Sequence, residues 1–155
     1  MPSSLRDEIK QTRPFKSLEE ETLLSIDRTA ALLLHRLADT FKPHDITITQ
    51  YNVLRILRGA GAEGLCRNEI RDRLIAQVPD VTRLLDRLEQ AGLLARERAS
   101  DDRRVVTTRI TTLGLALLQR LDAPVAGAQQ RALGHMNATQ LRTLIDLLAL
   151  ARTPA

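Results

Sequence analysis

Long apolar stripes with helical spacing occur near both ends of the chain. The first follows Ser17, whose hydroxyl can cap a helix, and Glu20 three residues later completes a capping-box pattern. It predicts a helix of about 25 residues that ends before Pro43. The last stripe follows the capping-box pair Asn137 and Gln140, and its apolar face holds Leu141, Leu144, Ile145, Leu148 and Ala151. Amphipathic helices of this length at chain ends often pair with a partner.

The middle of the chain begins with two shorter helices by the same criteria. Thr47 and Gln50 form a capping-box pattern that predicts a helix over residues 48–58, and the glycine-rich residues 59–64 break it. Cys66 occupies the next capping position, with Glu69 three residues later. The short helix that follows is expected to bury Ile70, Leu74 and Ile75.

Another short helix and a hairpin come next. The helix is predicted over residues 79–91, with Pro79 at its first position and Gly92 as its C-terminal stop. Its apolar face is expected to hold Val81, Leu84, Leu85, Leu88 and Ala91. Residues 93–96 and 105–110 favour two strands, and the charged residues 98–104 form the tip between them. Helix, turn, helix and hairpin in this order are the outline of a winged helix-turn-helix.

One more helix is predicted after Thr111, with Leu115, Leu118, Leu121 and Val125 on its face. Gly114 near its start and Pro124 within it argue against one straight helix. The fold class is therefore mainly α with a small β-hairpin wing, flanked by long helices.

Composition narrows the class of protein. The 155 residues are 43% hydrophobic and 27% charged but only 2% aromatic, so the core must be aliphatic. No apolar run reaches the ~18 residues of a membrane span, and residues 1–16 lack the apolar segment of a signal peptide. A single cysteine, Cys66, excludes an internal disulfide and a cysteine-rich zinc site. We expect a cytoplasmic protein.

Signatures of catalysis are missing from the sequence. His35, His44 and His135 are too scattered for a metal-binding pair on one helix. The chain has no G-x-S-x-G, no phosphate-binding glycine loop and no G-x-G-x-x-G. We therefore expect no enzyme, no metal and no cofactor.

Arginines dominate the basic residues and suggest a nucleic-acid partner. Arg83 and Arg87 lie four residues apart, so they project from one helix face. The predicted tip adds Arg98, Arg103 and Arg104, and Asp102 beside them can hold an arginine in one rotamer. Residues 66–110 nevertheless contain ten arginines against eight acidic residues. This small excess argues against tight non-specific binding but not against a specific site.

An ordered set of motifs resembles the MarR family of transcription regulators. Leu88-Glu89-Gln90-Ala91-Gly92-Leu93-Leu94 is similar to the family's exit from its second helix, and Asp102-Arg103-Arg104 to its wing tip. Ile110-Thr111-Thr112-Leu113-Gly114 is similar to the entry of the next helix. Upstream, Ile48-Thr49-Gln50-Tyr51-Asn52-Val53-Leu54 resembles the family's Q-[YFW]-x-[VL]-L helix. The resemblance covers residues 17–152.

The resemblance implies a homodimer on a pseudo-palindromic operator in double-stranded DNA. It divides the chain into a flexible N-terminal segment (1–16), an N-terminal dimerisation helix (17–45), a winged helix-turn-helix (46–110) and C-terminal dimerisation helices (111–155). The dimer interface is then expected to contain Leu23, Ile26, Leu141, Leu144 and Leu148.

Roles for single residues also follow from the resemblance. Thr82, Arg83 and Arg87 are the expected contacts of the recognition helix, and Gln77 near its entrance can reach phosphate or a base. Arg98 and either Arg103 or Arg104 are the expected wing contacts, with Asp102 as the orienting partner, and Arg71 is a weaker phosphate candidate. Pro79-Asp80 departs from the Ser or Thr that is more usual there; Asp80 can accept from a cytosine amino group or simply complement the helix N-terminus.

Regulators of this family commonly respond to small aromatic acids, phenols or oxidants. A repressor released by such a small molecule is the leading hypothesis, and Arg36, His35 and His44 are candidates for its site between the dimer helices and the DNA-reading domain. Thiol-based control through Cys66 is one alternative. A winged-helix module for protein association without DNA specificity is the other.

Overall fold

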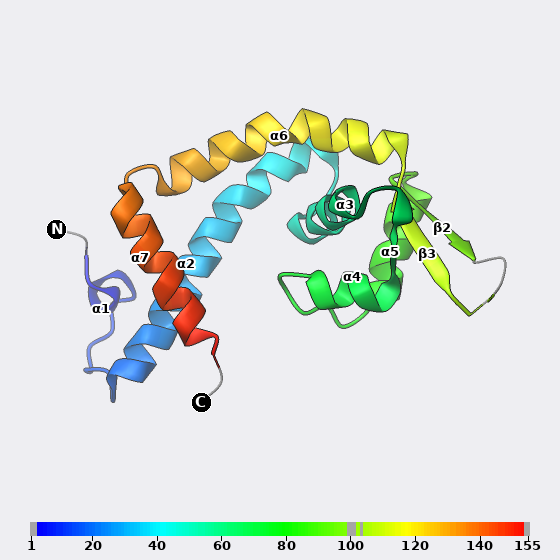
Figure 1. Cartoon of the computed structure of the whole chain (residues 1–155). Helices are drawn as coiled ribbons and strands as arrows, with labels where there is room; N and C mark the ends of the chain where they lie inside the picture. Colours follow the sequence, from blue (N-terminus) through cyan, green and yellow to red (C-terminus); the bar gives the residue numbers. More distant parts are fainter. Residues whose placement is uncertain (1–2, 99–101, 103, 154–155) are drawn as a thin grey trace.

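The computed structural model describes residues 3–98, 102 and 104–153. The helices are α1 (Leu5–Glu8), α2 (Leu18–Phe41), α3 (Ile48–Ala60), α4 (Arg67–Arg73), α5 (Val81–Gln90), α6 (Thr112–Leu133) and α7 (Ala138–Ala151). Two 3₁₀ turns, η1 (Lys42–His44) and η2 (Gly61–Glu63), and three strands, β1 (Leu65–Cys66), β2 (Leu94–Arg98) and β3 (Val106–Ile110), complete the order. In Figure 1, α6 arches over α2 and joins the α3–β3 part of the chain to α7.

The three strands form one antiparallel sheet in the order β1-β3-β2. The β2–β3 hairpin runs in register from Leu94 opposite Ile110 to Arg98 opposite Val106. β1 was not predicted: it pairs Leu65 with Thr108 and Cys66 with Thr107, on the other side of β3. A strand of two residues leaves no alternating pattern in the sequence, so only the pairing partner defines it.

One hydrophobic core lies where α3, α4, α5 and the sheet meet the first half of α6. Its fully buried side chains include Leu54, Leu57, Ile70, Leu85, Leu88, Leu94, Leu118 and Leu121. Phe41 closes the core at the end of α2, and its ring centroid lies 4.7 Å from that of Tyr51. The core is otherwise aliphatic, which agrees with the low aromatic content.

Capping boxes set several helix boundaries. Those of α3 at Thr47 and of α7 at Asn137 form as predicted. At α2, Ser17 caps through the N–H of Glu20, but the Glu20 carboxylate accepts from the N–H of Lys16 at 2.6 Å instead of closing a box on Ser17. The helix α1, which Ser4 caps, was not predicted within residues 1–16.

Three details of the predicted helices, in their buried faces and their bounds, are wrong. α4 ends at Arg73 and the chain becomes extended at Leu74, so helical spacing no longer applies and Ile75 is 81% exposed. On α6, Leu117 is buried instead of Leu115, because the helix turns Gly114 towards Leu93. α5 begins at Val81 with Asp80 as its N-cap, not at Pro79, and Ala91 after its end is exposed.

Apolar side chains on α2 and α7 remain uncovered. Leu23 is 68% exposed and Ile26 36%, and α7 has no buried residue. Leu141, Leu144 and Leu148 are half-buried, whereas the outward side of α7 carries Ile145, Leu147 and Leu150 at 62%, 58% and 70% exposure. Within the described residues, no helix is both long and apolar enough to cross a membrane.

Candidate nucleic-acid interface

α5 is fixed at both ends and presents a basic face. At its start, the Asp80 carboxylate accepts from the backbone N–H of Arg83 at 2.9 Å. At its end, Gly92 adopts a positive φ of 72°, and the N–H of Leu93 bonds back to the carbonyl of Leu88 at 3.0 Å. The N–H of Gly92 also bonds to the carbonyl of Glu89 at 2.9 Å, and the two bonds together form a Schellman motif. Hydrogen bonds therefore fix α5 at both ends.

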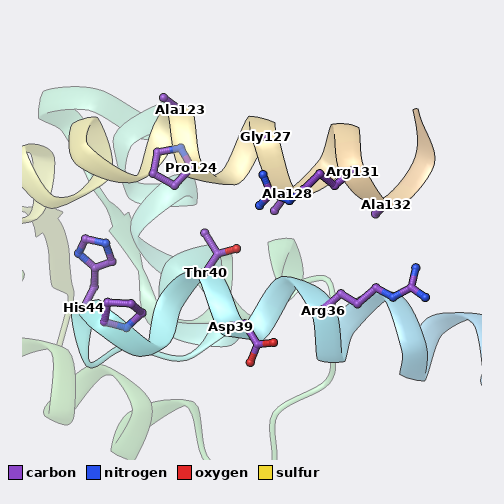
Figure 2. A pocket seen from close by; sticks show the side chains of 11 residues that line it. Arg36, Asp39, Thr40, His44, Ala123, Pro124, Gly127, Ala128, Arg131 and Ala132 are labelled. Atoms are coloured by element: carbon purple, nitrogen blue, oxygen red, sulfur yellow. The ribbon is translucent and has the colours of Figure 1, made fainter. Parts of the chain in front are cut away.

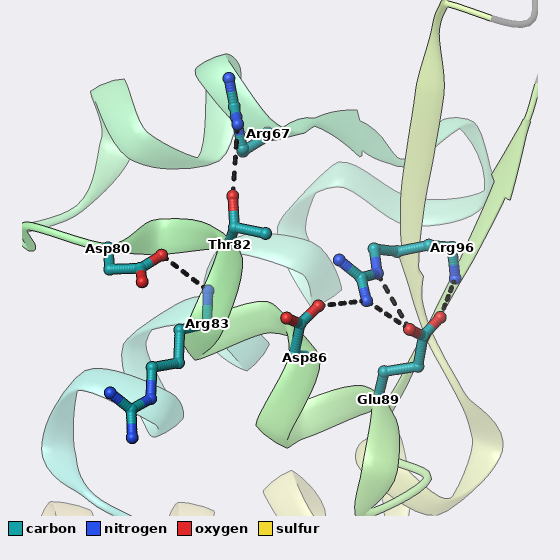
Figure 3. Close-up of polar contacts among 7 residues, drawn as sticks. All are labelled: Arg67, Asp80, Thr82, Arg83, Asp86, Glu89 and Arg96. Carbon is teal, nitrogen blue, oxygen red and sulfur yellow. Dashed lines mark hydrogen bonds and ion pairs between the residues drawn. The ribbon is translucent and has the colours of Figure 1, made fainter.

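The two arginines predicted on the recognition helix lie on its open side. Val81, Leu85 and Leu88 anchor the opposite side in the core, and Arg83 and Arg87 are exposed. Among the described residues, neither guanidinium has a carboxylate within 4.0 Å. Asp80 binds the backbone of Arg83 and not its guanidinium (Figure 3). Such guanidiniums are suited to phosphate oxygens and guanine edges.

The N-terminal turn of α5 is linked to α4. The Arg67 guanidinium donates to the Thr82 hydroxyl at 3.2 Å and thereby orients it (Figure 3). Arg67 was not predicted to take part. Arg71 is exposed and pairs with its neighbour Asp72 at 3.1 Å, and Gln77 is exposed in the loop between the helices.

Asp102 makes two hydrogen bonds to the backbone of the wing tip. Its carboxylate accepts from the backbone N–H of Arg104 at 2.9 Å, and its carbonyl accepts from the N–H of Val105 at 3.0 Å. These bonds shape the tip backbone, and the predicted role of Asp102 in orienting an arginine side chain stays a prediction. Arg98 and Arg104 are exposed at the tip, and Arg103 lies outside the described residues.

A cluster between the wing and the recognition helix was missed in the sequence. The Arg96 guanidinium on β2 pairs with Asp86 at 2.6 Å and with Glu89 through Nε at 3.0 Å, both on α5 (Figure 3). The hydrogen bond to Arg96 holds the pKa of Glu89 below its usual value, and the bond to Glu89 raises the pKa of Arg96. Two acidic residues three positions apart on a helix are common, so the sequence offered no specific signal.

Two cavities adjoin the end of α2. The larger, about 860 Å³, lies between α2 and α6 and is lined by Arg36, Asp39, Thr40, His44, Pro124 and Arg131 among others (Figure 2). The second, about 460 Å³, lies between η1, α5 and the start of α6, and its lining includes His44, Gln50, Arg87 and Arg120.

Only two of the three predicted ligand-binding residues line a cavity. Arg36 and His44 line the larger cavity, whereas His35 is exposed and belongs to neither lining. The Lys42 ammonium, hydrogen-bonded to Asp39, holds the pKa of that carboxyl below its usual value. In the described part of the chain, no three His, Cys, Asp or Glu side chains gather where they could hold a metal ion.

The rigid α5, the hairpin beside it and their exposed arginines define a winged helix-turn-helix DNA-binding protein. The sequence model of the MarR family matches residues 46–106. The HTH-type transcriptional regulator PecS of Dickeya dadantii (strain 3937) is 30% identical over 121 residues, which cover 77% of this chain and 73% of PecS. The chain belongs to the MarR family and is a DNA-binding transcription regulator. The fold class and the family predicted from the sequence are thereby confirmed.

Solved structures agree with this assignment. A MarR transcription factor from Planctomyces limnophilus is 40% identical, with a TM-score of 0.68 over 88% of this chain and 99% of that one. A cysteine-to-serine mutant of MarR from E. coli, solved in complex with operator DNA, is 26% identical, with a TM-score of 0.77 over 97% of this chain and 100% of that one. Proteins of this family regulate transcription and are not enzymes.

Proposed function

We propose that the chain acts as a homodimeric repressor that binds a pseudo-palindromic operator and leaves it when a small molecule binds. The observation that carries this proposal is the pair of exposed guanidiniums of Arg83 and Arg87 on the rigid face of α5, which contact no carboxylate among the described residues. The likeness to E. coli MarR, which was solved with operator DNA, supports it. Since such a regulator must share a compartment with DNA, cytoplasmic localisation is part of the proposal.

Operator binding is tested by fluorescence anisotropy with the duplex upstream of the protein's own gene and a scrambled duplex. Wild type should prefer the first, and Arg83→Ala with Arg87→Ala should lose most of that preference, about 5- to 150-fold for each base contact. Arg142→Ala with Arg152→Ala removes the same two positive charges from exposed positions on α7 and at its C-cap, and should change neither affinity. A protein-association module without DNA specificity would bind both duplexes alike at every salt concentration.

The dimer is supported by the apolar side chains that α2 and α7 leave open at the end of the molecule opposite the wing (Figure 1). Sedimentation equilibrium should give twice the 17.3 kDa mass of one chain. Leu147→Glu on α7 should shift this equilibrium to monomers, because a charge in an apolar interface is costly. Leu115→Glu is the matched control, since Leu115 is also exposed but lies on the first half of α6. A wild-type monomer at micromolar concentration would contradict the proposal.

The larger cavity is the proposed effector site. Its walls combine the apolar Ala123, Pro124 and Ala128 with two guanidiniums, Arg36 on α2 and Arg131 on α6. This composition suits an aromatic body that carries an acid group. Thr40 and His44 point from α2 and the turn after it into the space below α6 (Figure 2), where they can orient such a ligand.

Salicylate and phenol serve as the charged and uncharged probes for this site. Salicylate should release wild type from the operator duplex at lower concentration than phenol, and Arg36→Gln should remove the difference. His35→Gln, one residue away but outside the cavity lining, is the matched control and should respond like wild type. Equal release of wild type and Arg36→Gln by salicylate would place the effector elsewhere.

A further inference from the structure

Arg96 joins the wing to the recognition helix through a cluster of hydrogen bonds. Its guanidinium reaches the carboxylates of Asp86 and Glu89, and its backbone N–H donates to Glu89 at 3.1 Å (Figure 3). Only 23% of the Arg96 side chain is exposed, against 46% for Asp86 and 39% for Glu89. The arginine therefore lies beneath the two acids and faces α5.

The position of these acids makes the cluster relevant to DNA. Asp86 directly precedes Arg87, and Glu89 follows it by two residues. Without Arg96, the two carboxylates would balance the charges of Arg83 and Arg87 on the same short helix. Carboxylates beside a phosphate backbone oppose binding. With Arg96 in place, both acids are bound on the β2 side of α5, whereas Arg83 extends away from them (Figure 3).

The cluster also completes a mechanical connection. β2 starts two residues after Gly92, so its first part is already held by the turn at the end of α5. Arg96 lies two residues further along and ties the strand to α5 again, within the last two turns of the helix. Because β2 pairs with β3 along its whole length, Arg98 at the far end of β2 is fixed relative to α5 through this contact.

We infer that Arg96 is a positioning residue for operator recognition: it cancels the charge of Asp86 and Glu89 and sets the wing at a fixed angle to the recognition helix, without touching DNA itself. This inference rests on the proposed operator binding. The two acids are both more than a third exposed, so we expect their ion pairs with Arg96 to add little to the free energy of unfolding. The role in DNA recognition is therefore separable from a role in folding.

The experiment measures the ratio of operator to scrambled-duplex affinity at several salt concentrations. Arg96→Gln leaves two uncompensated acids and a loosened wing, so operator affinity should fall at least tenfold and the ratio should fall with it. The double variant Asp86→Asn with Glu89→Gln keeps Arg96 but removes both of its carboxylate partners. Scrambled-duplex binding should then rise, because two negative charges are gone, while the ratio still falls because the wing is no longer fixed.

Two further variants separate position from charge. The triple variant with Arg96→Gln, Asp86→Asn and Glu89→Gln should bind the scrambled duplex more tightly than Arg96→Gln. Its ratio of operator to scrambled-duplex affinity should stay as low as that of Arg96→Gln. Arg96→Lys keeps the charge but lacks the planar fork that bridges both acids, so its ratio should lie between those of wild type and Arg96→Gln. Arg109→Gln is the matched control: Arg109 pairs with Glu97 within the wing at 3.1 Å and has no ion pair with α5 among the described residues, so its ratio should stay within twofold of wild type.

The outcomes separate this inference from the proposed function. If wild type shows no operator preference, the proposed function fails first. The positioning role is refuted if wild type prefers the operator and if both Arg96→Gln and the double variant Asp86→Asn with Glu89→Gln keep the affinity ratio within twofold of wild type. If Arg96→Gln does not fold, Arg96→Lys and the Asp86/Glu89 pair, which retain a cation at position 96, decide the same question. A ratio unchanged in the pair, with tighter binding to both duplexes, would instead make Arg96 a direct phosphate contact.

Discussion

Gly114 should tolerate no side chain, because α6 begins in contact with the backbone of the wing. A Cβ at this position would lie 2.3 Å from the carbonyl oxygen of Leu93 and 2.7 Å from the side chain of Ile110. The same carbonyl accepts the N–H of Thr111 at 3.1 Å, so it cannot retreat without loss of that hydrogen bond. Leu93 is itself only 7% exposed. Gly114→Ala therefore forces either the start of α6 or the start of β2 to move.

The expected loss follows from these contacts. Overpacking of a tight interior costs about 1–3 kcal/mol, and a weakened hydrogen bond adds roughly 1 kcal/mol. The helix propensity of alanine returns up to ~1 kcal/mol. The free energy of unfolding should then fall by about 1–3 kcal/mol, a large share of the roughly 5–15 kcal/mol that holds a domain folded. For a chain of this size, that is a decrease in Tm of roughly 2–12 °C.

Urea and thermal unfolding at one fixed protomer concentration measure this effect, since the stability of a dimer depends on concentration. Gly59→Ala supplies the matched control. Gly59 lies in α3, and a Cβ there meets nothing within 4 Å. That variant should gain about 0.5–1 kcal/mol, because alanine loses less backbone entropy than glycine in a helix. A Gly114→Ala protein as stable as wild type would refute the close approach of α6 to Leu93.

Three further predictions concern side chains. Asp80→Ala should lower the free energy of unfolding by about 1 kcal/mol and Asp80→Ser should restore most of it, because both aspartate and serine can cap α5. Hydrogen bonding to Arg96 lowers the pKa of Glu89 in the fold, so its ion pair stabilises the protein near neutral pH and loses this effect as the pH falls through that pKa. In urea titrations, the stability difference between wild type and Glu89→Gln should be constant near neutral pH and shrink as the pH falls below 4.5, the ordinary pKa of the group. Arg58→Ala removes the ion pair between Arg58 of α3 and Asp122 of α6, in which both side chains are at least a third exposed. In urea titrations, it should lower the free energy of unfolding by no more than about 1 kcal/mol.

Local hydrogen bonds explain which parts of the fold the sequence predicted well. The capping boxes at Thr47 and Asn137 involve residues three positions apart, and both helices begin where these pairs place them. The stop at Gly92 depends on the positive φ that glycine adopts freely, and α5 ends there. Such features need no knowledge of distant parts of the chain.

The errors occur where a distant part of the chain decides. β1 exists only because Leu65 and Cys66 meet β3, which lies far along the chain at Thr107 and Thr108. The buried side of α6 depends on the approach of Gly114 to Leu93, so periodicity alone selected Leu115 instead of Leu117. For the site, spacing placed Arg83 and Arg87 on one exposed face, but Arg96 could not be found, because its partners depend on the angle between β2 and α5.

Like α2, whose Phe41 closes the core, α6 reaches both the DNA-reading half and the end that carries the open apolar side chains. Its first half is buried in the winged-helix core through Leu117, Leu118 and Leu121, and its second half lines the larger cavity opposite α2. Pro124 lies between these halves and has no N–H, so the carbonyl of Arg120 loses its helical hydrogen bond. α6 thus lacks one backbone hydrogen bond beside the proposed effector site. We expect a ligand bound there to change the position of one half of α6 relative to the other more readily than a ligand on α5, whose two ends are fixed by hydrogen bonds.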